Sequence, residues 1–260
     1  MIIYKTRQEI ESIRQSGQIL GKAHGEVAKH VKPGVTTKFL DKIAEEFIKD
    51  HYAEPSFLGY NGFPASLCIS VNEVVVHGIP NVKELVDGDI VSIDCGVKFK
   101  GYHADSAYTY EVGAVNEKVR QLLKVTKASL YEAIKQIQNG SRIGDISYAV
   151  QTYAESFGFS IVRELVGHGV GRNLHEKPDV PNFGKRGKGP KLSNGMVIAI
   201  EPMINMGSRF IVQEKDGWTI RTRDRAPSAH FEHTVAVIDG RAEVLTTFEF
   251  IEAIIDNHYA

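Results

Sequence analysis

A pattern that occurs twice along the chain constrains its fold more than any other feature. Gly34 and Gly140, which are 106 residues apart, each precede apolar residues at helical spacing. Gly88 and Gly195, which are 107 residues apart, each open an apolar, strand-like run and stand six residues before the acid that ends it. Two segments repeated in the same order at nearly the same offset indicate an internal duplication. The alternative is a chance similarity of common turn and strand patterns.

The periodicity of apolar residues predicts the order helices, strands, helices, strands. The first helix begins at a capping box, Thr6-Arg7-Gln8-Glu9, and Pro33-Gly34 interrupts its pattern. We therefore expect a single domain over residues 1–260, built from halves of about 1–115 and 116–250. Helical patterns cover about 10–20, 39–47, 119–134 and 146–153, and strand-like runs lie within 67–112 and at 160–166, 196–204, 210–213, 218–222 and 229–237.

The composition is that of an ordinary soluble globular protein, since 42% of the 260 residues are hydrophobic, 24% are charged and the net charge is -1. This balance gives no reason to expect binding to nucleic acid or to a membrane. The N-terminal segment carries too many charges for a signal peptide, and no apolar run reaches membrane-spanning length. Cys68 and Cys95 fit neither a zinc site nor a disulfide framework. We expect a cytoplasmic protein with reduced thiols and a basic surface loop at 184–191.

Two aspartates, Asp94 and Asp105, stand in neighbouring strand-like runs, where this residue type is uncommon. If the loop between the runs is 98–101, the two aspartates face each other across the hairpin. If the loop is only Lys100-Gly101, they are diagonal neighbours. In both cases their side chains project from the same face, and like charges placed so closely are destabilising. A shared divalent cation would remove this repulsion.

Three further residues extend this pair to a set of five candidate metal ligands. Glu201 ends an apolar run as Asp94 does, Glu232 interrupts another such run, and His168 stands among glycines that leave its ring room near a ligand. Taken singly, an acid in a strand is usually an edge residue and a His-Gly pair is usually a turn. Taken together, four carboxylates would balance two divalent ions about 3.5–4 Å apart, a pair that activates water for hydrolysis of an amide, an ester or a phosphate. The set is Asp94, Asp105, His168, Glu201 and Glu232.

Five motifs cover essentially the whole chain, to about Leu245, and resemble those of the type I methionine aminopeptidases of bacteria, which are pita-bread metallopeptidases. The resemblance implies an α+β fold in which helices of two pseudo-symmetric halves flank a curved antiparallel sheet, with the site between the halves. It also implies removal of the N-terminal methionine from peptides and nascent proteins, with a small second residue favoured and a metal-bridged hydroxide attacking the first peptide bond. The motifs are CISVNEVVVHGIP, DGDIVSIDCGVKFKGYHADSAYTY, GHGVGRNLHEKP, NGMVIAIEPMI and HFEHTVAV.

The resemblance implies two divalent metal ions as cofactors, of a kind such as Co, Mn or Fe. It places Asp94 on one ion and His168 and Glu201 on the other, while Asp105 and Glu232 bridge the two. Glu201 is also the residue that the resemblance assigns as proton shuttle.

Two more histidines have catalytic roles by resemblance. His77 hydrogen-bonds the scissile amide or the leaving nitrogen, and His175 stabilises the oxyanion that develops on the carbonyl. Without the resemblance, His77 is better explained as a turn residue before Ile79-Pro80, and His175 as a cap-like partner of Glu176.

The resemblance also implies an apolar, adaptable pocket for the methionine side chain. Many relatives have an aromatic residue at the position that Leu174 occupies in this chain. A monovalent-cation site of some relatives matches Asn72 and the backbones of Val74 and Ser228. The substrate-binding residues implied are Tyr60, Phe63, Cys68, His77, His175 and Trp218.

Two alternatives share this fold. A prolidase or aminopeptidase P relative has the same five ligands, but usually carries a large extra N-terminal domain, whereas the first catalytic-domain helix is expected here at about residue 6. A non-catalytic pita-bread protein typically lacks metal ligands, and all five are present here.

The spacing of the acids and the start of the sequence favour the short bacterial form of the enzyme. Glu201 and Glu232 are only 31 positions apart, which leaves no room for the helical insertion of type II enzymes. No zinc-binding extension precedes Met1. We therefore expect a monomer that acts on N-terminal methionines, with a transient ribosome contact through its basic loop and no sequence-specific nucleic acid as partner.

Overall fold

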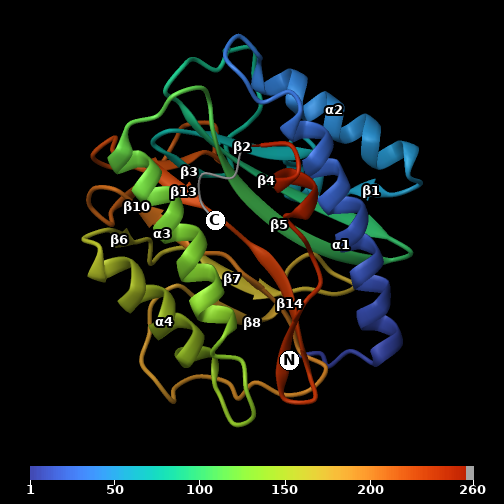
Figure 1. Cartoon of the computed structure of the whole chain (residues 1–260). Helices are drawn as coiled ribbons and strands as arrows, with labels where there is room; N and C mark the ends of the chain where they lie inside the picture. Colours follow the sequence, from blue (N-terminus) through green and yellow to red (C-terminus); the bar gives the residue numbers. More distant parts are fainter. Residues whose placement is uncertain (256–260) are drawn as a thin grey trace.

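Helices and strands follow one another in the predicted order in the computed structural model, which describes residues 1–255 (Figure 1). The four predicted helices are present, and two short helices were not expected. The helices are α1 (Arg7–Ala28), α2 (Thr37–Asp50), η1 (Tyr60–Gly62, a 3-10 helix), α3 (Glu117–Ile134), α4 (Ile143–Ser156) and α5 (Glu249–Glu252). None of the helices within this described range is long and apolar enough to cross a membrane.

The strands pair antiparallel in four hydrogen-bonded sheets, with the orders β1-β4-β2 (with β5 on β4), β13-β10-β6, β11-β12-β3 and β15-β14-β9-β7-β8. They are β1 (Glu54–Pro55), β2 (Leu67–Val71), β3 (Val74–Val76), β4 (Ile90–Phe99), β5 (Tyr102–Glu111), β6 (Ser160–Ile161), β7 (Val166–Gly169), β8 (Glu176–Pro181), β9 (Val197–Ile200), β10 (Met203–Asn205), β11 (Ile211–Gln213), β12 (Ile220–Thr222), β13 (Ser228–His230), β14 (His233–Ile238) and β15 (Arg241–Val244).

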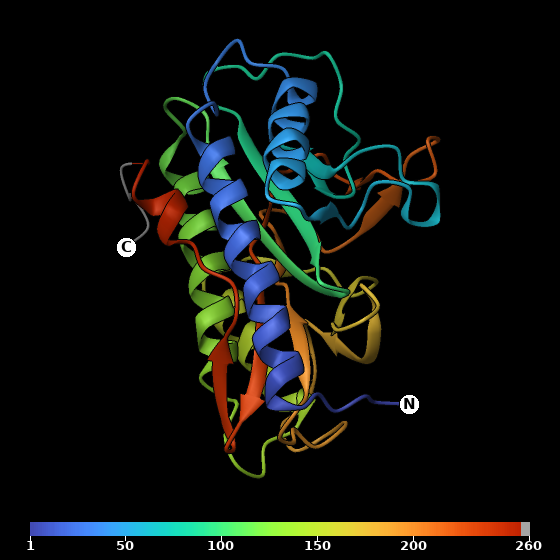
Figure 2. The same ribbon diagram turned by 90° about the vertical axis from the view of Figure 1, so that its right-hand side faces the viewer.

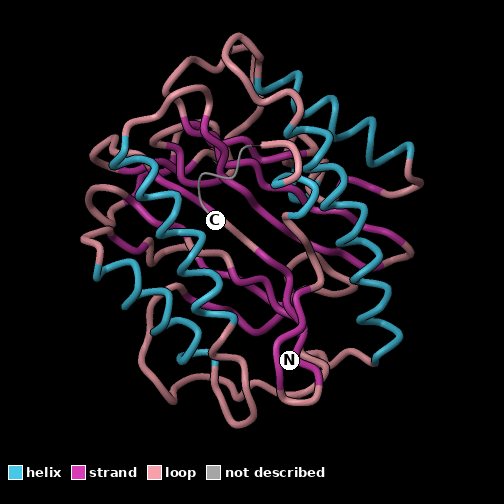
Figure 3. Tube along the Cα trace, viewed as in Figure 1, coloured by secondary structure: helices cyan, strands magenta, loops and turns pink. Residues whose placement is uncertain are grey.

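The long helices cover one side of the strands. Helices α1 and α2 pack over β4 and β2, and α3 and α4 pack against strands later in the chain, so that the front view shows two pairs of helices with strands visible between them (Figure 3). In the side view, α1 and α3 stand together on the same side of the strands (Figure 2). This arrangement confirms the prediction of helices flanking antiparallel sheet.

Helix α1 shows how local sequence fixes an element and then its packing. The capping box is confirmed, because the Thr6 hydroxyl accepts a bond from Glu9 N (3.2 Å) and Glu9 Oε2 accepts one from Thr6 N (2.9 Å). Two glycines on the buried face let the C-terminal segment approach the helix backbone. A Cβ atom on Gly17 would lie 2.3 Å from Leu245 O, and one on Gly25 would lie 2.8 Å from Phe250 Cβ.

The hairpin of β4 and β5 has the shorter of the two predicted loops. Lys100 and Gly101 both have positive φ, 51° and 82°, as a two-residue hairpin turn of type I′ requires. In this register Asp94 pairs with Ala107, and Asp105 pairs with Gly96. The two aspartates are therefore diagonal neighbours on one face of the hairpin, and the four-residue loop is wrong.

Strands lie in the predicted strand-like runs 196–204 and 229–237, but each run is divided between two strands. Strands β9 and β10 are separated at Glu201-Pro202, and β13 and β14 at Phe231-Glu232. Proline has no N–H for the ladder, so Pro202 ends the pairing there. The run 160–166 is likewise split between β6 and β7. As a result, Glu201 and Glu232 lie beside each other where the chain passes from one sheet to another.

A seam of buried hydroxyl groups joins the two halves of the chain. Thr109 Oγ1 donates to His230 O (2.7 Å) and accepts from His230 N (3.0 Å). Thr234 Oγ1 bonds in the same way to Asp105, donating to its O (2.8 Å) and accepting from its N (2.9 Å). Both threonines are fully buried. Between these bridges Ser106 Oγ donates to Glu232 O (2.9 Å), so β5 and the segment around Glu232 are fixed together.

Replacing Thr234 with valine should destabilise the protein by roughly 1–3 kcal/mol, because the buried N–H and C=O of Asp105 lose their partner while the shape is kept. Urea unfolding of the metal-free protein measures the free energy of unfolding. The matched control is Thr152→Val, at an exposed hydroxyl on α4, which should change it by less than about 0.5 kcal/mol. Equal effects of the two substitutions would contradict the importance of the seam.

Candidate metal centre

The five predicted ligands lie together in one cavity of about 340 Å³. The same cavity contains the two predicted catalytic histidines and every predicted pocket residue. Its lining is Phe57, Tyr60, Asn61, Phe63, Cys68, His77, Asp94, Asp105, His168, Leu174, His175, Glu201, Trp218 and Glu232.

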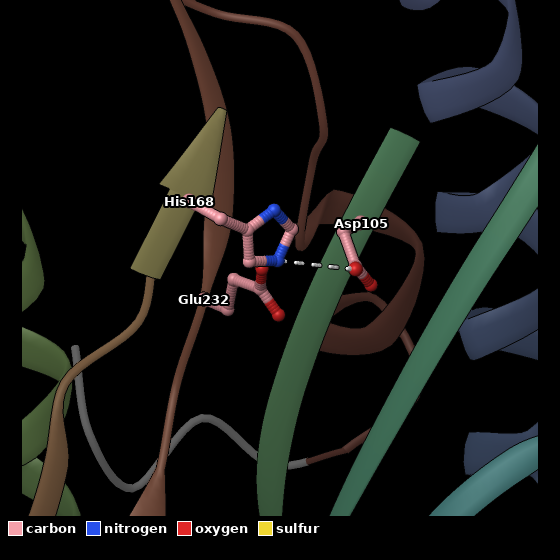
Figure 4. A group of neighbouring side chains, drawn as sticks. All are labelled: Asp105, His168 and Glu232. Carbon is pink, nitrogen blue, oxygen red and sulfur yellow. Dashed lines mark ion pairs between the residues drawn. The ribbon is translucent and has the colours of Figure 1, made fainter. Parts of the chain in front are cut away.

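Three of the candidate ligands converge from different elements (Figure 4). Asp105 lies in β5, His168 in β7, and Glu232 at the break between β13 and β14. One ligand atom from each lies within 4.8 Å of the others, and all three side chains are buried. His168 Nε2 is 3.8 Å from Asp105 Oδ2 and 3.6 Å from Oε1 of Glu201, which brings the fourth ligand to the group. Asp94 completes the cluster beside Asp105 on the shared face of the hairpin.

Burial of the four carboxyl groups raises their pKa values. Desolvation raises the pKa of Asp94 to about 7. The pKa of Asp105 rises well above its usual range through desolvation and then through the neighbouring charge of Asp94. Desolvation and nearby carboxylates also raise the pKa values of Glu201 and Glu232. A cluster of this kind resists ionisation at neutral pH unless positive charge is supplied.

His168, the histidine of the cluster, has the tautomer and the protonation state that a neutral metal ligand needs. Its Nδ1 donates to Gly169 O (2.9 Å), so in the neutral ring the lone pair is on Nε2, which faces the carboxylates. Burial lowers the pKa of His168 to about 3, which keeps the ring uncharged at neutral pH. A lone pair aimed at carboxylate oxygens is repulsive by itself and becomes favourable when a cation lies between them.

The donor atoms of the cluster fit divalent metal ions. The buried atoms Asp94 Oδ1, Asp105 Oδ1 and Glu232 Oε1 have no hydrogen-bond partner among the described residues. Buried polar atoms are almost always partnered, so three orphaned carboxylate oxygens in one cluster indicate a partner of another kind. Four carboxylates and one imidazole are ligands that Mn, Fe and Co accept readily.

The two catalytic candidates outside the cluster lie at its rim. His77 has a positive φ of 57°, a backbone conformation uncommon for this residue type. Burial lowers its pKa to about 4. Nδ1 of His175 is 2.9 Å from the hydroxyl of Tyr60, and its ring centroid is 4.1 Å from that of His168. Both side chains line the cavity that contains the cluster.

An apolar wall continues directly from the cluster. Phe63 and Trp218 meet edge to face with centroids 5.1 Å apart. Cys68 pairs with Asp94 in the sheet, so the wall and the cluster share adjacent strands. Leu174 is 1% exposed and packs into this wall, where many relatives were expected to have an aromatic ring. Its buried members are Phe57, Phe63, Ala65, Cys68 and Leu174, with Ile79 and Trp218 packed against them.

Three residues near the cluster were missed in the sequence. Phe57 and Asn61 line the cavity, and their loop gave no periodic signal. His230 is 1% exposed, and its Nε2 is 3.7 Å from Glu201 Oε2. The signal that was available for His230 is its place two residues before Glu232, which puts both on one side of an extended segment.

Residues of the predicted monovalent-cation site also come together. Asn72 O accepts a bond from Ser228 N (2.9 Å), and the Asn72 side chain accepts one from Ile90 N (3.0 Å). Val74 begins the adjacent strand β3. Cation binding by this group stays a prediction.

Comparison with known proteins gives a consistent result. The methionine aminopeptidase 1 of Bacillus subtilis is 52% identical over 246 residues, covering 95% of this chain and 99% of its own. The crystal structure of methionine aminopeptidase from Rickettsia prowazekii has a TM-score of 0.94 at 42% identity, covering 95% and 100% of the two chains. The prolidase from Pyrococcus furiosus has a TM-score of 0.76 at 24% identity and covers 66% of its chain, a likeness that shows the fold alone.

These similarities confirm the predicted pita-bread architecture, in which the helices and antiparallel sheets described above surround the carboxylate cluster. The model of metallopeptidase family M24 matches residues 11–239, which include all five candidate ligands. The chain is therefore a member of metallopeptidase family M24.

Proposed function

We propose that this protein is a metal-dependent aminopeptidase that removes the N-terminal methionine from peptides and nascent proteins and favours a small second residue. The observation that carries the proposal is that one cavity joins a carboxylate cluster to an apolar wall. A thioether suits such a wall of aromatic and sulfur-containing side chains. The activity in the names of the relatives from Bacillus subtilis and Rickettsia prowazekii supports the same substrate.

In this proposal two divalent ions are held by the five ligands. Asp94 would hold one ion, His168 and Glu201 the other, and Asp105 and Glu232 would contact both. When bound, such ions lower the pKa of a water molecule and polarise the scissile carbonyl. Mn, Co and Fe are the candidates that the oxygen-rich ligand set favours.

The side chains of the chain itself would orient the substrate and move protons. Glu201 lies beside His168 and would carry the proton from the attacking water to the leaving amine. His175 would donate to the developing oxyanion, and His77 to the scissile amide. Burial lowers the pKa of His77 to about 4, and desolvation also lowers the pKa of His175, which favours the uncharged form of both rings. Each therefore offers one N–H donor without adding charge to the site.

The cellular setting is proposed from the substrate and the surface. Nascent chains present N-terminal methionine in the cytoplasm, so we place a monomeric enzyme there. The exposed basic loop 185–191 would make the transient ribosome contact. We also propose that the halves 1–115 and 116–250 arose by duplication, which the matched bridges at Thr109 and Thr234 support.

A peptide panel tests the function. With added Mn or Co, the protein should cleave Met-Gly, Met-Ala and Met-Ser peptides and leave X-Pro peptides intact, and a chelator should abolish turnover. Trp218→Ala should reduce the preference for methionine, because it removes part of the apolar wall. Cleavage of X-Pro peptides instead would favour the prolidase alternative, and equal cleavage of N-terminal Met, Lys and Glu would exclude the proposed pocket.

Metal binding should strengthen with pH. The pKa of Asp94 is about 7, so below pH 7 the ion must displace a proton, and the Mn affinity should fall about tenfold per pH unit for each proton released. His168 does not contribute to this slope above pH 5, because its pKa is about 3. Calorimetry in buffers of different ionisation enthalpy counts the protons. An affinity that stays constant between pH 5.5 and 7 would refute the proton-linked site.

His175 should act on turnover and not on metal binding. We expect His175→Ala to keep its metals and to lose turnover by roughly 10²–10³, the effect of removing one oxyanion donor. His77→Ala should impair longer peptides at least as strongly, because its assigned contact is to the leaving amide. Metal analysis and steady-state rates on both variants provide the measurement. If His175→Ala lost metal in proportion to its activity, the residue would be a ligand.

A further inference from the structure

A buried ion pair lies directly behind the loop that carries His175. Lys5 belongs to the segment before α1, and Glu176 is the residue that follows His175 and opens β8. Lys5 Nζ is 2.6 Å from Glu176 Oε2, and each side chain is only 3% exposed. The two residues are 171 positions apart, so the contact joins the start of the chain to the candidate active site.

Glu176 fixes the shape of the loop between Gly171 and His175. Its Oε1 accepts a bond from Asn173 N (3.1 Å), and Gly171 N donates to Asn173 O (3.1 Å). The loop is tied to β5 as well, since His103 N donates to Gly171 O (2.8 Å). A Cβ atom on Gly171 would lie 2.6 Å from Glu176 Oε1 and 2.6 Å from Lys5 Cε. The loop therefore wraps closely around the ion pair.

Lys5 is itself held in place. Its backbone N donates to Gly195 O (2.7 Å), and its Nζ donates a second bond to Ile3 O (3.1 Å). Ile2 forms a parallel bridge with Lys177, the residue after Glu176. The N-terminal segment thus reaches β8 through two contacts and presents the ammonium group from a fixed backbone.

A buried ion pair is a poor source of net stability, because taking two charges out of water costs about as much as their attraction returns. Such a pair can instead define position, since leaving either charge unpaired is strongly unfavourable. Here the ion pair would fix the position of the loop that bears Leu174 and His175. Both of these residues line the cavity, and His175 directly precedes Glu176.

We propose that Lys5 and Glu176 are a positioning pair that sets the His175 imidazole for catalysis. The inference rests on the proposed function, in which His175 stabilises the oxyanion. The N-terminal segment then belongs to the catalytic apparatus, although none of its residues lines the cavity.

A double-mutant cycle tests the pair. Lys5→Met keeps the length of the side chain and removes its charge; we expect turnover to fall about tenfold, with the KM for a Met-Ala peptide and the metal content changed less than twofold. In a His175→Ala background the same substitution should change turnover less than twofold, because the group it positions is gone. Lys135→Met removes an exposed ion pair at the C-terminal end of α3 and is the matched control, expected to leave turnover unchanged in both backgrounds.

Glu176→Gln is the second variant, to be used if Lys5→Met does not fold. Glutamine has nearly the same size and shape as glutamate, so we expect this variant to fold. It should reproduce the loss of turnover. The readout independent of activity is the imidazole NMR signal of His175, assigned by its absence in His175→Ala, which should shift in Lys5→Met and Glu176→Gln and not in Lys135→Met.

The outcomes separate the positioning pair from the proposed function. Equal losses of turnover in the presence and absence of His175, or an unmoved His175 signal, would overturn the positioning pair. Failure of the unmodified protein to cleave methionine peptides would overturn the proposed function, and the NMR signal would still decide whether the pair sets the ring.

Discussion

The site depends on the hydroxyl seam between β5 and the segment from His230 to Thr234. Asp105 comes from the first part of the chain and Glu232 from the second, and their carboxylates lie in one buried cluster. Thr234 satisfies both backbone groups of Asp105, and Thr109 does the same for His230. A side-chain hydroxyl is short and bonds in two directions, so it fixes the separation of the two segments more closely than apolar packing does. The seam therefore also sets the distance between the segments that carry the carboxylates of Asp105 and Glu232.

The seam holds together groups that repel one another. Without an ion, desolvation and mutual repulsion raise the pKa values of the carboxyl groups, so protons occupy part of the cluster at neutral pH. The lone pair on Nε2 of His168 faces the same oxygens. The surrounding sheets therefore hold the ligand side chains close together, although repulsion within the cluster would move them apart. This is the condition for a preorganised metal site, in which the scaffold and not the ion determines where the ligands stand.

Most of the site could be read from the sequence because its acids violate a local rule. Asp94 and Asp105 stand in strand interiors, where acids are uncommon, and the repeated sequence pattern pointed to Glu201. Periodicity gave the helices but could not detect the breaks at Glu201 and Glu232, since their flanks are apolar on both sides. It also missed β8, whose two prolines and charges do not alternate like a buried strand.

The length of the loop between β4 and β5, which makes Asp105 a diagonal neighbour of Asp94, was left open, because it depends on the φ angles of Lys100 and Gly101. The contact of Lys5 with Glu176 spans 171 residues, and a single sequence gives no signal for it.

The close passage of the C-terminal segment over α1 has a consequence for biosynthesis. Leu245 and Phe250 lie against Gly17 and Gly25, so helix α1 receives these covering neighbours from a segment that is synthesised much later. Contacts this distant along the chain form late and slowly. Until they form, the apolar face of α1 is incompletely covered, and the partly made chain carries exposed surface of the kind that chaperones bind. An enzyme proposed to trim nascent chains would thus complete the packing of its own α1 only after residues 245–250 have been synthesised.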